Sequence, residues 1–185
     1  MDFRIDYKAF SLKSNYFDNQ SIIHGINHTY RVMYHVLQIA TVLKLKREGV
    51  VAFCAAYIHD LARLNDGYCT QHGAWASERK LSLYKDLFLR TGLADSDLGE
   101  IEIAVTNHSL TKELDKNDNA YLVTALLKDA DALDRIRLGD ENLDLGFLRF
   151  AESKMMVSRS KEIFFATDKM SFRNFAEILE FIESI

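Results

Sequence analysis

An uncharged stretch at residues 50–58, followed directly by His59 and Asp60, constrains the fold of this chain more than any other feature. A helix that is apolar on all sides lies in the middle of a domain rather than on its surface. Its last turn then presents an imidazole beside a carboxylate. Because an ionised group at a buried helix end is costly unless it is paired or binds a metal, this pair indicates a cation site. For an isolated pair, the alternative is a capping aspartate next to a buried, hydrogen-bonded histidine.

Length and composition are those of one globular domain. The chain has 185 residues, of which 48% are hydrophobic and 27% are charged. It contains no proline, which leaves helices free to continue. Hydrophobic residues recur at helical spacing nearly everywhere, and no alternating strand pair with a hairpin turn is evident. We therefore predict an all-α fold, a helical bundle around a buried central helix, in a single domain at residues 1–185.

Helical periodicity divides the chain into predicted elements. Five helices are expected at about 27–47, 50–64, 72–88, 98–108 and 121–137. The separators are Glu48-Gly49, the turn Asn65-Asp66-Gly67, Gly92 with Asp95-Ser96-Asp97, and a polar loop at 116–119. The fifth helix is expected to end before Gly139. Residues 1–22 are expected to form only short helices. Helical pieces around 143–156 and 172–182 are expected to pack on the rest of the domain.

Charge, hydropathy and cysteine content limit the partners of the chain. The net charge of −4 does not favour nucleic-acid binding. No apolar run approaches the ~20 residues needed to cross a bilayer, and residues 1–6 lack a signal-peptide core. Two cysteines do not make a disulfide framework. We therefore expect a cytoplasmic protein without a membrane partner. The apolar pairs Met155-Met156 and Phe164-Phe165 are expected in the core, with a lid or an oligomer contact as the alternatives.

Most of the histidines lie at predicted helix ends or beside loops, where side chains from several helices can converge. The six are His24, His28, His35, His59, His72 and His108. Helical spacing puts His24, His28, Arg31 and His35 on one face if the first helix reaches back to His24, which Gly25 opposes. It also puts Lys128, Asp131, Asp134 and Arg135 on one face of the fifth helix. Asp129 points about 200° away from Asp131, so we do not include it in the site.

The order of these residues resembles the HD-domain metal-dependent phosphohydrolase superfamily. The matching stretches are HGINHTYRV at 24–32, YIHD at 57–60 and KDADALDR at 128–135. The resemblance extends over residues 24–139. A lone His-Asp pair would be a weak motif, whereas the ordered set of all these residues is a strong one. Carried over by position, it implies four metal ligands, which are His28, His59, Asp60 and Asp131.

Two further stretches look like those of superfamily branches that hold two metals. They are QHGAWA at 71–76 and TNHS at 106–109. Relatives in those branches cleave dinucleoside polyphosphates or cyclic dinucleotides. The resemblance implies that His72 and His108 complete a second metal and that Asp60 bridges the pair. The alternatives are a loop residue at a helix start for His72 and an imidazole favoured by the helix dipole for His108.

The expected chemistry is hydrolysis by metal-activated water. A histidine-rich set with carboxylates suits Fe, Mn, Ni, Co or Zn better than Mg or Ca, and we expect two ions. The substrate would be a small phosphoester or phosphoanhydride, nucleotide-like or another phosphorylated compound. Asp60 and His24 are the predicted catalytic residues, His24 as a proton donor. Arg31, Arg63 and Lys128 are the predicted substrate-binding residues. For either arginine the alternative is a surface pair with Asp66 or Glu78.

One departure from the superfamily bears on the reaction. Some mononuclear nucleotidases have an acidic residue three positions after the His-Asp pair, where this chain has Arg63. This favours the two-metal branches over a deoxynucleoside-monophosphatase mechanism. Two other classes stay open: a di-iron oxygenase such as the relative myo-inositol oxygenase, and a sensor that binds a nucleotide or metal without turnover. Ligand identity alone does not separate these classes.

Overall fold

Helix α2 (Lys46–Ile58) lies at the centre of the molecule, and every residue from Gly49 to Ile58 is buried. The computed structural model describes residues 4–139 and 143–185. These residues form eight α-helices, four short 3-10 helices and no strand. The predictions of an all-α fold and of a buried central helix are therefore confirmed. The run of uncharged side chains leaves α2 without a polar face, so other helices must cover it.

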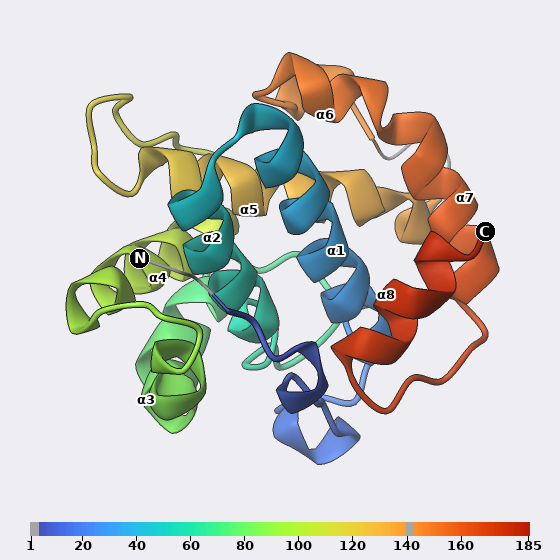
Figure 1. Ribbon diagram of the computed structural model, residues 1–185, viewed down its shortest axis with the longest axis horizontal. Helices are drawn as coiled ribbons and strands as arrows, with labels where there is room; N and C mark the ends of the chain where they lie inside the picture. Colours follow the sequence, from blue (N-terminus) through green and yellow to red (C-terminus); the bar gives the residue numbers. More distant parts are fainter. Residues whose placement is uncertain (1–3, 140–142) are drawn as a thin grey trace.

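The helices that pack most extensively on α2 are α1 (Ile26–Leu43), α4 (Asp95–His108) and α5 (Tyr121–Leu133). The other α-helices are α3 (His72–Leu89), α6 (Ala151–Met155), α7 (Val157–Thr167) and α8 (Phe175–Glu183). The 3-10 helices are η1 (Tyr7–Ala9), η2 (Ser14–Tyr16), η3 (Asp134–Leu138) and η4 (Leu145–Phe147). Figure 1 shows α3 and α4 on one side of α2 and the orange-to-red helices α6, α7 and α8 on the other.

The break between α1 and α2 is not where the sequence suggested. We expected Glu48-Gly49 to separate the helices, but α1 ends at Leu43 and α2 begins at Lys46. Lys44 turns the chain with a left-handed φ of 59°. Gly49 lies inside α2, where a Cβ would come within 2.6 Å of the Cβ of Ala40. The glycine therefore serves the close approach of the two helices, not their separation.

The end of the buried helix was also misplaced. We expected it near Leu64, but α2 ends at Ile58. The chain then continues in turns, in which the amide of Leu61 donates to the carbonyl of Ile58 and the amide of Arg63 to that of Asp60. His59 and Asp60 therefore follow α2 directly and lie in a buried turn.

Three helix boundaries agree with the pattern: α3 begins at His72, α4 ends at His108 and α5 begins at Tyr121. The start of α4 was misplaced, because Asp95-Ser96-Asp97 form its first turn instead of preceding it. The fifth helix ends at Leu133 and continues as η3, which stops at Gly139 with φ of 116°. Helix α7 was not predicted. Met155 and Phe165 are 76% and 72% exposed, so the expectation that they lie in the core was wrong.

The C-terminal helix α8 packs on the centre of the molecule. The Phe53 ring of α2 contacts Phe10 at 4.8 Å and Phe175 at 5.0 Å between ring centroids. Ile178 and Ile182 belong to the same apolar cluster. Among residues 4–139 and 143–185, no helix combines the length and the apolar character that a membrane crossing requires.

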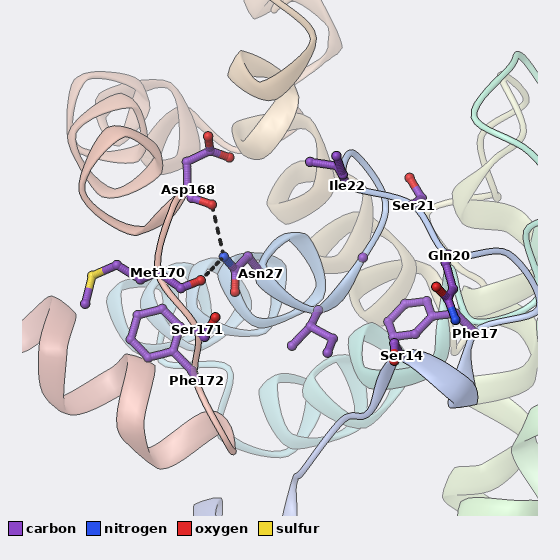
Figure 2. A pocket seen from close by; sticks show the side chains of 12 residues that line it. Ser14, Phe17, Gln20, Ser21, Ile22, Asn27, Asp168, Met170, Ser171 and Phe172 are labelled. Atoms are coloured by element: carbon purple, nitrogen blue, oxygen red, sulfur yellow. Dashed lines mark hydrogen bonds between the residues drawn. The ribbon is translucent and has the colours of Figure 1, made fainter.

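The start of α1 is tied to the chain that follows α7. The side-chain amide of Asn27 donates to the carbonyl oxygens of Thr167, Asp168 and Met170 at 3.1, 3.3 and 2.9 Å, and the last two bonds are drawn in Figure 2. A cavity of about 450 Å³ lies beside this contact, between Phe17 and Phe172. The C-terminal segment thus helps to hold the helix that carries His28.

Candidate metal centre

Five elements each contribute one end to the site. His28 lies in the first turn of α1, His59 and Asp60 follow the last turn of α2, and His72 begins α3. His108 is the last residue of α4, and Asp131 is in the last turn of α5. The structure brings all six predicted metal ligands together, although the first and the last are more than a hundred residues apart. A site at the meeting point of helix ends needs only one or two side chains from each helix.

The first ligand set lies around His28 and His59. Their Nε2 atoms are 3.2 Å apart. The Nε2 of His28 is also 3.4 Å from Oδ1 of Asp131 and 3.4 Å from Oδ2 of Asp60. His28, His59 and Asp131 form a group whose ligand atoms all lie within 4.8 Å of one another, which is compact enough to hold a metal ion.

The second ligand set lies on the other oxygen of Asp60. The Nε2 atoms of His72 and His108 are 3.0 Å apart, and they lie 3.2 and 3.7 Å from Oδ1 of Asp60. His59, Asp60 and His108 also form a group that could hold a metal ion. Asp60 therefore presents one carboxylate oxygen to each set, as a bridging ligand does.

The outer nitrogens of the imidazoles fix which way the rings point. Nδ1 of His59 donates to the carbonyl oxygen of Ala56 at 2.7 Å. Nδ1 of His72 donates to that of Cys69 at 2.8 Å, and Nδ1 of His108 donates to that of Val105 at 2.5 Å. In His28 it donates to Oδ2 of Asp134 at 2.7 Å. A carbonyl oxygen can only accept, so Nδ1 carries the proton and Nε2 of the neutral ring is a bare lone pair. This arrangement is typical of metal-bound histidine.

The lone pairs then need a positive charge between them. Nε2 atoms that face each other at 3.0 and 3.2 Å without a proton repel rather than bond. Burial lowers the pKa of His59 to about 3, so that ring is neutral near pH 7. Burial alone would raise the pKa of Asp60, but the surrounding imidazoles, first that of His59, outweigh it and hold this pKa well below its usual range. A neutral His59 imidazole beside the ionised carboxylate of Asp60 fits a divalent transition metal.

Arg31 has a structural role that the sequence did not reveal. It is 2% exposed, and its Nε and Nη2 donate to the two oxygens of Asp134 at 2.5 and 3.0 Å. Its guanidinium lies 4.9 Å from the ring centroid of Phe164. The geometry contradicts the predicted contact of Arg31 with substrate, and also its alternative as a surface arginine, because its donors are used inside the protein. Through Asp134, Arg31 instead orients His28.

Asp134 is the residue that the sequence analysis missed. It is fully buried, and the neighbouring Arg31 overcomes the effect of burial and keeps its pKa well below the usual range. The only signal was its position three residues after Asp131, on the same predicted helical face. That signal does not distinguish a residue that orients a ligand from a ligand.

The other predicted substrate-binding residues are also engaged. Nε of Arg63 donates to Oδ1 of Asp60 at 3.1 Å, and its Nη1 donates to the carbonyl oxygens of Asn65 and Gly67. Its partner is thus a predicted ligand and not Asp66 or Glu78. Nζ of Lys128 donates to Glu113 and to the carbonyl of Lys112, both at 3.1 Å.

His24 precedes α1 and lies against the ligands. Its Nδ1 is 2.9 Å from Oδ2 of Asp60, and the residue is 4% exposed. With His28 and Asp60 it forms another group that could hold a metal ion. Burial lowers the pKa of His24, which leaves the ring neutral near pH 7. Its role as a proton donor stays a prediction.

A cavity of about 350 Å³ leads to the ligands from outside. His108 and Asp131 form part of its wall. Three basic residues line it, Lys128, Arg135 and Arg149, and so do two further acidic residues, Glu113 and Asp144. Tyr68 and Phe147 add two exposed aromatic side chains. The site is therefore accessible to a small molecule through an entrance that carries charges of both signs.

The spacing of α3 and α4 at the second set depends on Gly73. A Cβ at this position would clash with the backbone carbonyl of Val105 and would lie 3.1 Å from Nδ1 of His108. We expect Gly73→Ala to lower the free energy of unfolding by about 1–3 kcal/mol, as overpacking does. The control is Gly99→Ala on α4, where the new Cβ meets nothing within 4 Å. This variant should raise the free energy of unfolding by up to about 1 kcal/mol. Urea denaturation measures both, and equal effects would contradict the assigned role of Gly73.

Comparison of the chain with protein-family models, with curated proteins and with solved structures gave no match. The interpretation of the site therefore depends on its own geometry. That geometry defines a buried cluster of histidine and aspartate side chains, set at the ends of helices, that could bind metal.

Proposed function

We propose that this chain is a metal-dependent phosphohydrolase that uses two divalent transition-metal ions to cleave a phosphoester or phosphoanhydride. One observation carries the proposal. Four histidines direct Nδ1 outward to oxygen acceptors and Nε2 inward, in two pairs that lie on opposite oxygens of Asp60. This arrangement supports two ions that share one carboxylate.

Six side chains of the cluster would bind the two ions, and Arg63 would position one of these side chains. His28, His59 and Asp131 would hold one ion, His72 and His108 the other, and Asp60 both. When bound, such ions supply a water of lowered pKa and a Lewis acid for the phosphoryl oxygens. Arg63 fixes the orientation of Asp60 through its 3.1 Å bond to Oδ1.

The cavity supports a phosphorylated substrate. Lys128, Arg135 and Arg149 supply cationic groups in its wall for phosphate oxygens, beside the carboxylates of Glu113, Asp131 and Asp144, of which Asp131 would hold metal. Lys128 and Arg149 are held by Glu113, so they are fixed rather than mobile charges. Mixed imidazole and carboxylate ligands favour Mn, Fe, Co, Ni or Zn over Mg and Ca.

Turnover is tested with the purified protein after loading with Mn, Co or Ni. We expect release of phosphate or of a nucleotide product from members of a library of small phosphorylated compounds, and loss of this activity on chelation. The variant His72→Ala/His108→Ala should keep its helical circular dichroism and one of two ions, and should lose most turnover. Elemental analysis gives the number of ions.

The matched control is Leu83→Ala/Ile103→Ala, which alters exposed side chains on the same two helices. It should keep both ions and full turnover. If an iron-loaded sample consumes oxygen and hydrolyses none of the library, the alternative of a di-iron oxygenase is favoured. A wild-type protein with no bound transition metal would exclude the proposed site.

A further inference from the structure

Arg137 is a buried cation that reaches the metal centre from η3. Its side chain is 6% exposed. Nη2 lies 3.4 Å from Oδ1 of Asp131 and 3.4 Å from Nδ1 of His24. The guanidinium therefore stands between a ligand of the first set and the histidine that lies on Asp60.

The donors of Arg137 are poorly used for a buried group. Nη1 donates to the carbonyl oxygen of Asp134 at 3.0 Å, whereas both contacts of Nη2 are at the long limit of a hydrogen bond. Nε is buried and has no hydrogen-bond partner within residues 4–139 and 143–185. A buried donor without a partner is costly, and more so when it is charged.

The basic residues that the sequence predicted for the site contrast with Arg137, which it did not predict. Arg31 places the Nε–Nη2 edge of its guanidinium on Asp134, in two bonds of 2.5 and 3.0 Å. Arg63 donates from Nε to Asp60, and Lys128 donates to Glu113 and to a backbone carbonyl. In Arg137 the same Nε–Nη2 edge has one donor without a partner and one with only long contacts. That edge can bind two oxygens of an oxyanion in parallel.

We propose that Arg137 binds the anionic group of the ligand at the metal centre, by holding two oxygens of a tetrahedral oxyanion on its Nε–Nη2 edge. The inference rests on the proposed function, because it places the phosphoryl group beside Asp131. A divalent cation on Asp131 would weaken the hold of this carboxylate on Arg137 and free Nη2 for the anion. Arg137 thereby takes the substrate-binding role that was expected of Arg31.

The test is a calorimetric titration of inorganic phosphate into the Mn²⁺-loaded full chain. Wild type should bind phosphate, and Arg137→Met should bind it about tenfold more weakly or worse, because two charge-assisted hydrogen bonds are lost. Arg137→Lys, which keeps the charge but not the two-pronged edge, should fall between them. Arg173→Met is the control: it removes an arginine whose side chain is 90% exposed, and it should bind phosphate as wild type does.

Metal affinity separates this role from a structural one. Arg137→Met should bind Mn²⁺ as tightly as wild type or more tightly, since it removes a positive charge beside Asp131. A variant that loses Mn²⁺ and phosphate together, or one with unchanged phosphate affinity, overturns the role of Arg137. So does Mn²⁺-loaded wild type that binds no phosphate. Wild type that binds no Mn²⁺ at all instead refutes the proposed function.

Discussion

Asp60→Ala is expected to remove bound transition metal from the purified protein altogether. Asp60 is the residue that faces both histidine pairs, with Oδ2 3.4 Å from Nε2 of His28 and Oδ1 3.2 Å from Nε2 of His72. Its loss takes a ligand from each ion and the shared negative charge from between them. His59→Ala should also lose metal, at least the ion of the first set, because its Nε2 belongs to the group formed with His28 and Asp131. Elemental analysis of wild type and variants gives the metal content per chain.

Asp131→Asn should also lose metal, because an amide is a neutral and poorer ligand for a divalent cation. The control is Asp66→Ala, which removes an exposed carboxylate from the turn after Arg63 and should leave the metal content unchanged. If wild type, Asp60→Ala and His59→Ala contain the same amount of metal, the cluster is not a metal site. The circular dichroism of each variant shows whether the helices are retained.

Arg31→Met is expected to lower the free energy of unfolding by about 3–5 kcal/mol, the cost of leaving one member of a buried ion pair without its partner. Asp134 is fully buried, and its two oxygens accept from Nε and Nη2 of Arg31. The loss should be larger than that caused by removing any exposed arginine. Denaturant unfolding monitored by circular dichroism measures it.

The double variant Arg31→Met/Asp134→Leu separates the fold from the site. Stability should return in large part, because the uncompensated charge is gone. Metal affinity should stay reduced by about 10–100-fold, since Nδ1 of His28 then has no carboxylate to orient it. Recovery of both properties would show that Asp134 does not orient His28. An Arg31→Met variant as stable as wild type would contradict the buried pair itself.

Several features follow from local sequence alone. The uncharged residues before His59 predict a helix with no solvated face, and α2 is buried on all sides. The absence of proline and the helical spacing predict an all-α fold, which the described residues have. The starts of α3 at His72 and of α5 at Tyr121 follow from the preceding turn and polar loop. Such features depend on neighbours within a few residues, which a pattern can report.

Other features depend on which distant segments touch, and only the tertiary structure decided them. Gly49 reads as a helix breaker, but it is a point of close helix packing, because Ala40 of α1 lies against it. Arg31 reads as a phosphate ligand, but the carboxylate that binds it is 103 positions away. The same holds for Arg137, whose contact with His24 joins η3 to the segment just before α1. Local sequence determined the fold class and the residue types available at the helix ends, whereas tertiary packing decided the partner of each charge, because side-chain pairing is set by distance in space.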